Sequence, residues 1–243
     1  MAKAILEVEN LSKSFGGLKA VDHVSFQVQK GRILGLIGPN GAGKTTLFNL
    51  ITGFLKPDGG NVYFHGQRIT GLKPHKICQL GVARTFQVTR PFSKISAVEN
   101  IATAALLRHP HREDSINQAF HIARRIGLED EINKMASDLT IGNMKKLGFA
   151  QVLATEPEIV LLDEVVAGLN PSEIDEMLGI IRSVAKEGLT VIMVEHVMEA
   201  IMKVCNPVLV MDEGKLIAEG SPQEIAENEK VIKAYLGERY EVM

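Results

Sequence analysis

The stretch Gly38-Pro39-Asn40-Gly41-Ala42-Gly43-Lys44-Thr45 decides the fold of this chain. It fits the pattern G-x-x-x-x-G-K-[ST], a loop that holds nucleotide phosphates. The apolar run before it, residues 33–37, predicts a buried strand, and residues 46–51 after it predict a helix. Strand, loop and helix therefore follow one another in the order that a phosphate-binding loop requires. This context weakens the alternative of a glycine-rich turn that fits the pattern by chance.

Each residue type in the loop has a physical reason. Gly38, Gly41 and Gly43 permit backbone conformations closed to other residues, so successive N–H groups can point at phosphate oxygens. The helix N-terminus that follows adds free N–H groups and a positive dipole end. Lys44 supplies a charge for the terminal phosphates, and the Thr45 hydroxyl can ligate Mg²⁺. The predicted nucleotide-binding residues here are Gly38, Pro39, Asn40, Gly41, Ala42, Gly43, Lys44, Thr45 and Thr46.

Size and composition narrow the class of protein. With 243 residues the chain can hold one large or two small domains, and 45% hydrophobic with 23% charged residues is ordinary for a globular protein. The formal charge of −2 gives no overall attraction to nucleic acid. Cys78 and Cys205 lack metal-ligand spacing, which favours a reduced cytosolic protein. Neither a secretory leader nor a run of about 20 apolar residues is present, so we expect no membrane insertion by the chain alone.

The first hundred residues predict strands around the loop. Residues 5–8 and 24–28 have strand character, the second by alternation of apolar and polar residues. Phe15 lies between them in a turn-forming stretch, where an aromatic side chain is less expected in a core. It is a candidate to stack on a nucleotide base, and the alternative is a hydrophobic plug over the first sheet.

The middle of the chain has helical character. Ser96 and Glu99 form an S-x-x-E capping box that predicts a helix start, and residues 116–126 are amphipathic. The polar segment 108–114 between them predicts an exposed loop. We expect residues 91–153, approximately, to form a helical insertion between strands of an α/β core.

Two carboxylates follow the next buried strand. Residues 159–162 are apolar and lead directly into Asp163 and Glu164. At the carboxyl end of a strand in an open α/β sheet, ligands bind, so Asp163 can hold Mg²⁺ opposite Thr45. Glu164 can orient or deprotonate an attacking water. The alternative is a pair of helix-start charges without a catalytic role.

Two more polar residues follow predicted strands and can reach the same edge. Gln87 can offer a carbonyl oxygen to Mg²⁺ and an amide to water. His196 can donate to a γ-phosphate oxygen and stabilise the charge that grows during transfer. The candidate catalytic residues are therefore Glu164, His196 and Gln87, and the candidate metal ligands are Thr45, Gln87 and Asp163.

The order and spacing of these features resemble the ATP-binding subunit of ABC transporters over essentially the whole chain. The matching segments are residues 84–87 (Q-loop), 139–143 (signature), 159–164 (Walker B), 167–170 (D-loop), His196 (switch histidine) and Phe15 (A-loop). The resemblance implies one nucleotide-binding domain, residues 1–243, that binds and hydrolyses ATP with Mg²⁺. It implies an α/β fold: a P-loop NTPase core of mainly parallel sheet, an N-terminal antiparallel β subdomain and a helical insertion subdomain.

The signature departs from the family's L-S-G-G-Q. In the family this segment lies at a helix N-terminus and closes over the γ-phosphate held by a second subunit. Thr140 keeps a hydroxyl, and Gly142 keeps one position without a side chain, where the nucleotide can approach the backbone closely. Both are therefore candidate nucleotide-binding residues. Ile141 and Asn143 replace the first glycine and the glutamine. Because the donors are mostly backbone N–H groups and a dipole, we expect weakened rather than abolished closure.

Other segments resemble one branch of the family. Residues 51–57, 82–87, 167–170 and 231–237 are similar to subunits that drive import of branched-chain and other hydrophobic amino acids. The ATPase of lipopolysaccharide export is similar in several of these stretches, so a lipid exporter is the first alternative. A non-transport ABC-type ATPase, a P-loop kinase and a catalytically silent regulator are further alternatives.

The resemblance also implies partners. These are integral membrane permease subunits, docked near residues 88–92, and a second ATP-binding subunit that is either identical or similar. A substrate-binding protein acts indirectly, and no nucleic acid is expected. The chain would then be peripheral, held at the cytoplasmic face of the cell membrane through the permease.

Overall fold

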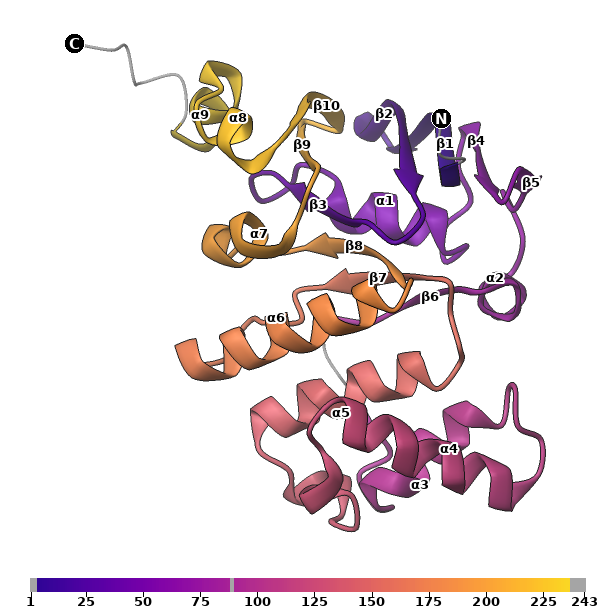
Figure 1. The fold of residues 1–243 in the computed structure, drawn as a ribbon. Coiled ribbons are helices and arrows are strands. Elements are labelled where there is room, and N and C mark those ends of the chain that lie inside the picture. Colours follow the sequence, from indigo (N-terminus) through magenta and orange to yellow (C-terminus); the bar gives the residue numbers. More distant parts are fainter. Residues whose placement is uncertain (1–3, 88–89, 237–243) are drawn as a thin grey trace.

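The computed structural model describes residues 4–87 and 90–236, which form two sheets and a set of helices (Figure 1). The first sheet is antiparallel, with strand order β2-β1-β4-β5. Its strands are β1 (Ala4–Phe15), β2 (Leu18–Gln29), β4 (Gly59–Phe64) and β5 (Gln67–Arg68). This is the N-terminal antiparallel unit that the sequence predicts.

The second sheet has six strands in the order β10-β9-β3-β8-β7-β6. All neighbouring pairs from β9 to β6 are parallel, and only the edge strand β10 is antiparallel. The strands are β3 (Ile33–Ile37), β6 (Val82–Arg84), β7 (Ile159–Asp163), β8 (Thr190–Val194), β9 (Val208–Asp212) and β10 (Lys215–Gly220). The mainly parallel α/β core is thereby confirmed.

Helices cover both faces of the parallel sheet. The helix α1 (Lys44–Ile51) lies between the two sheets, where Leu47 and Phe48 are fully buried (Figure 1). A second apolar cluster on the opposite face includes Leu147 and Phe149 of α5 and Leu178 of α6. The remaining helices are α2 (Pro74–Leu80), α3 (Ala97–Ala105), α4 (Arg112–Arg125), α5 (Ile141–Leu153), α6 (Pro171–Lys186), α7 (Met198–Val204), α8 (Pro222–Ala226) and α9 (Glu229–Leu236). Leu47 and Phe48 share one buried apolar cluster with Leu34 and Leu36 of β3, which holds α1 against that strand.

Local sequence sets where several helices begin. Ser96 caps α3 by accepting the Glu99 N–H, while the Glu99 carboxylate accepts the Ser96 N–H. The predicted capping box is therefore confirmed. The same reciprocal pattern begins α6 at Asn170 and Glu173. Each such cap stabilises its helix by about 1 kcal/mol.

Two local predictions differ from the structure. Phe15 ends β1 rather than lying in the turn, because the pairing with β2 continues to Leu18. The helix α4 begins at Arg112, inside the segment that was expected to be a loop. Its first turn contains Glu113 and Asp114, whose negative charges are favourable at the positive end of a helix.

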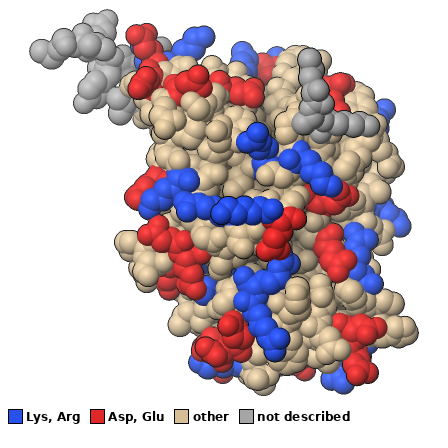
Figure 2. Space-filling view, viewed as in Figure 1, with Lys and Arg blue, Asp and Glu red and all other residues tan. Residues whose placement is uncertain are grey.

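Charged side chains of both signs are mixed on the face shown in Figure 2. Ion pairs join many charged side chains of the described residues, as between Lys203 and both Asp175 and Glu199. This face therefore carries no strong field of a single sign. None of the described helices combines the length and the apolar composition that a bilayer crossing needs.

Candidate functional site

The loop between β3 and α1 requires its glycines. Gly38 and Gly43 have φ of +153° and +100°. A Cβ atom at Gly38 would lie 2.1 Å from the Met211 carbonyl oxygen, and one at Gly43 would lie 2.1 Å from the Ala20 carbonyl oxygen. Backbone of two neighbouring strands therefore encloses the loop on both sides, which leaves no room for a side chain at either position.

Lys44 is the first residue of α1 and is 6% exposed. Its Nζ donates to the carbonyl oxygens of Gly38 (2.7 Å) and Pro39 (3.0 Å). Burial lowers the pKa of Lys44, and the nearby carboxylates of Glu164 and Asp163 oppose that shift. The ammonium is thus held on the loop, close to the acidic strand end and within reach of an anion bound there.

Three candidate catalytic side chains meet at one point. Glu164 Oε1 lies 2.9 Å from His196 Nε2, and Glu164 Oε2 accepts from Gln87 Nε2 at 2.8 Å. These residues follow β7, β8 and β6, whose parallel order puts their carboxyl ends at one edge. Glu164 has a φ of +52°, a conformation that non-glycine residues rarely adopt and that is common at functional sites.

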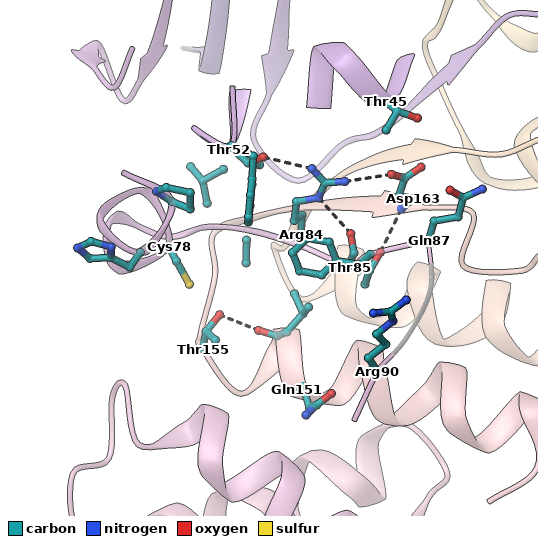
Figure 3. Close-up of a pocket in the computed structure, with 18 residues that line it drawn as sticks. Thr45, Thr52, Cys78, Arg84, Thr85, Gln87, Arg90, Gln151, Thr155 and Asp163 are labelled. Atoms are coloured by element: carbon teal, nitrogen blue, oxygen red, sulfur yellow. Dashed lines mark hydrogen bonds and ion pairs between the residues drawn. The ribbon is translucent and has the colours of Figure 1, made fainter. Parts of the chain in front are cut away.

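The candidate metal ligands line one cavity of about 860 Å³ (Figure 3). Thr45, Gln87 and Asp163 are among its lining residues. Asp163 is 2% exposed; burial raises the pKa of its carboxyl, and the Arg84 guanidinium opposes this. A hydroxyl, an amide carbonyl and a carboxylate are oxygen donors, the set that Mg²⁺ prefers. The residues therefore fit this metal.

Phe15, Thr140 and Gly142 lie apart from this cluster. Thr140 caps α5 by accepting the Asn143 N–H at 3.2 Å. In the described part of the chain, no hydrogen bond or ion pair joins Thr140 or Gly142 to the loop. Phe15 is 48% exposed, and its ring centroid lies 5.7 Å from Lys13 Nζ. Any nucleotide contact by Thr140 and Gly142 thus requires a second molecule or a rearrangement.

Three charged residues around the site were not predicted from the sequence. Lys145 Nζ donates to the Glu164 carbonyl oxygen (2.8 Å), Arg84 contacts Asp163, and Glu195 Oε1 accepts the Val166 N–H (2.8 Å). The one signal available was position: Arg84 ends a short buried strand and Glu195 directly follows another. A charge at such a place needs a partner, but the sequence does not name it.

Glu195 is buried without full hydrogen bonding. Glu195 is 2% exposed, and its Oε2 has no hydrogen-bond partner among residues 4–87 and 90–236. Burial raises the pKa of Glu195 from 4.5 to about 7, against the opposing hydrogen bond from Val166. The carboxyl is therefore partly neutral at physiological pH. Its hydrogen bond from Val166 joins the segment after Glu164 to the residue that precedes His196.

This shift predicts a pH-dependent stability. Because the pKa of Glu195 is raised in the folded state, its carboxyl leaves the free energy of unfolding unchanged below about pH 4.5. As the pH rises from there to about 7, ionisation of this carboxyl lowers the free energy of unfolding progressively. Relative to wild type, Glu195→Gln should gain up to about 3 kcal/mol of unfolding free energy between pH 5 and pH 8. Urea denaturation at both pH values measures it, with surface variant Glu219→Gln as control. If Glu195→Gln and wild type differed in unfolding free energy by the same amount at both pH values, the raised pKa of Glu195 would be contradicted.

Comparisons with known proteins agree with this arrangement. The family model described as ABC transporter matches residues 21–167, and the model described as branched-chain amino acid ATP-binding cassette transporter matches residues 215–241. The chain is 39% identical to a high-affinity branched-chain amino acid transport ATP-binding protein of Pseudomonas aeruginosa, over 98% of this chain and all of that protein. Identity to the corresponding Escherichia coli protein is 38%, with the same coverage.

Solved structures give the same result. A nucleotide-free ATP-binding cassette from an ABC transporter superposes with a TM-score of 0.89 at 32% identity, covering 97% of this chain and 100% of that chain. The ADP conformation of such a cassette superposes with the same score and identity, covering 98% and 100%. With the phosphate loop, the acidic strand end and the histidine in place, the chain belongs to the ABC transporter family as an ATP-binding, ATP-hydrolysing subunit.

Proposed function

We propose that this chain binds ATP with Mg²⁺ and hydrolyses it to drive import of branched-chain or other hydrophobic amino acids. The observation that carries the chemistry is the contact of Glu164 with both Gln87 and His196, beside the loop that holds Lys44. The cargo is proposed because relatives similar over the whole chain are branched-chain amino acid transport proteins. The C-terminal family match supports the same cargo.

The residues have separate roles in this proposal. Loop N–H groups and Lys44 bind the triphosphate, with Thr46 and the other loop residues around it, and Phe15 stacks on the adenine. Thr45, Asp163 and Gln87 would hold Mg²⁺, which would supply positive charge to neutralise the phosphates.

Glu164 accepts a proton from water as the water oxygen bonds to the γ-phosphorus. The bond from that phosphorus to the β–γ bridging oxygen breaks, which releases ADP and phosphate. His196 donates to a γ-phosphate oxygen and stabilises its charge.

A second ATP-binding subunit completes the site in this proposal. Its Thr140 and Gly142, or their equivalents, close over the triphosphate held by the loop. Residues 91–153, approximately, move as a helical subdomain within one nucleotide-binding domain. Ile141 is 64% exposed at the start of α5, where the family has a glycine, and we expect this to weaken closure.

We propose the cavity as the docking site for a cytoplasmic segment of the permease. Its walls include the exposed rings of Phe54 and Phe86, whose centroids lie 5.5 Å apart. Arg90 also lines it, while Val88 and Thr89 of the expected docking run fall outside the described residues. Because exposed aromatic rings and Gln87 line the same cavity, a permease segment that packs on the rings can influence the site through Gln87. Docking there would hold the chain at the cytoplasmic face of the membrane.

Alkylation of Cys78 tests this docking. Cys78 lines the cavity, whereas Cys205 is 2% exposed and burial raises the pKa of its thiol to about 12. A bulky maleimide should therefore react at Cys78 and abolish co-purification with detergent-solubilised permease subunits, while ATP binding persists. Cys78→Ser, treated identically, should still co-purify. Co-purification of the alkylated protein would place docking elsewhere.

The cargo is tested by uptake. The complex with its permease, reconstituted in proteoliposomes, should accumulate radiolabelled leucine when ATP and the substrate-binding protein are present. Leucine-independent ATP hydrolysis with extraction of lipid from the bilayer would instead support the exporter.

A further inference from the structure

Arg84 is a buried cation beside the proposed metal site. Its side chain is 6% exposed, and Nη2 lies 3.1 Å from Asp163 Oδ2. Nη1 donates to Asn49 Oδ1 of α1 at 2.6 Å, and Nε donates to the Thr85 carbonyl oxygen at 3.2 Å. Figure 3 shows the guanidinium between Thr52, which caps the end of α1, and Asp163, the last residue of β7. One planar group therefore joins the helix after the loop to the acidic strand end.

Three aromatic rings also surround the guanidinium. Its central carbon lies 4.9 Å from the Phe86 centroid, 5.6 Å from that of Phe54 and 6.0 Å from that of Phe48. Such contacts attract a cation and suit the flat guanidinium better than an ammonium. Arg84 is thus constrained by directed hydrogen bonds and by ring contacts.

These contacts determine how the Asp163 carboxylate lies. Its Oδ2 is engaged by Arg84, and its backbone N–H donates to Thr85 Oγ1 at 3.0 Å. The Arg84 contact opposes rotation of the carboxylate, and the Thr85 contact holds the backbone beneath it. Among the described residues no hydrogen bond is made to Oδ1, which can therefore face another ligand. Carboxylates that bind metals depend on such supporting hydrogen bonds, and losing one typically lowers metal affinity about 10- to 100-fold.

We propose that Arg84 is a positioning residue that aims the Asp163 carboxylate at Mg²⁺. The inference rests on the metal site of the proposed function. Arg84 acts through Asp163 and touches neither nucleotide nor reacting atoms. A contribution to folding stability alone explains the buried Arg84–Asp163 pair poorly, because a protein with a buried ion pair is often no more stable than one with apolar residues of the same volume there.

The test measures how much Mg²⁺ strengthens nucleotide binding. Titrate the purified chain with a fluorescent ATP analogue, once with Mg²⁺ and once with EDTA, and take the ratio of the two affinities as the metal gain. Arg84→Met should reduce the metal gain about 10-fold while the affinity in EDTA stays within about twofold. Arg84→Lys keeps the charge without the planar fork and should fall between. In Arg84→Lys, raising the Mg²⁺ concentration should restore turnover.

Two control variants distinguish the role of Arg84 from the presence of the metal site itself. Among the described residues, Arg108 donates to the backbone carbonyls of Thr155 and Gln79 and to no side chain, so Arg108→Met controls for loss of an arginine. Thr45→Ala tests the metal site itself. A wild-type metal gain in folded Arg84→Met, or in Arg84→Lys if the first variant does not fold, overturns the inference. If Thr45→Ala kept the wild-type metal gain, Mg²⁺ would bind at another place, and the proposal for Arg84 would then be wrong as well.

Discussion

Glu164→Gln should lower ATP turnover of the assembled transporter about 100- to 10,000-fold. Both carboxylate oxygens are engaged: Oε2 accepts a hydrogen bond from Gln87 Nε2 at 2.8 Å, and Oε1 lies 2.9 Å from His196 Nε2. Glutamine keeps the shape and one acceptor oxygen but cannot take a proton from water. Binding should persist, because the loop and Lys44 are unchanged. ATP-bound closed complexes should therefore accumulate.

Phosphate release at saturating ATP measures this effect, with ATP binding determined on the same preparation. Glu199→Gln is the matched control, because Glu199 pairs with Lys203 on the surface, 74% exposed. Such an exposed pair contributes little, so the control should turn over ATP like wild type. Unchanged turnover in Glu164→Gln would exclude Glu164 as the general base.

Lys44→Ala should weaken ATP binding about 10- to 100-fold. A hydrogen bond from a charged donor contributes about 1.5–3 kcal/mol, and every 1.4 kcal/mol is a tenfold change in affinity. The ammonium is already ordered, since it donates to the Gly38 and Pro39 carbonyl oxygens. Ordering it on a phosphate therefore loses little conformational freedom.

Equilibrium titration of the isolated chain with ATP measures this effect. Lys56→Ala is the matched control, because Lys56 lies on the exposed turn after α1 and outside the site. AMP, which lacks the phosphates that Lys44 would contact, should bind both variants and wild type alike. If Lys44→Ala bound ATP as tightly as wild type, the loop would not be the triphosphate site.

Local signals explain what the sequence could predict. Glycines, prolines, capping boxes and apolar runs determine where elements begin and end from a few neighbouring residues, and β3 (Ile33–Ile37) has the predicted bounds. Polar residues after parallel strands come together because the strands end at one edge, which the Glu164–Gln87–His196 contacts illustrate. The predicted triad required only the strand ends and their direction.

Long-range pairing explains what the sequence could not predict. Arg84 contacts Asp163, 79 residues later, because β6 and β7 pair with Arg84 opposite Leu161. No pattern within β6 reveals that register. Lys145 similarly reaches the Glu164 carbonyl only through packing of α5 against the core. Such partners arise from the assembled fold and not from periodicity.

A structure of Glu164→Gln with ATP and Mg²⁺ bound tests the central claim most directly. We expect the triphosphate on residues 38–45 of one subunit, with Lys44 at its terminal phosphates. Thr140 and Gly142, or the matching residues of a similar subunit, should close over it from the facing molecule. A triphosphate bound away from that loop would contradict the account, and so would a closed complex in which the facing start of α5 stays clear of the nucleotide.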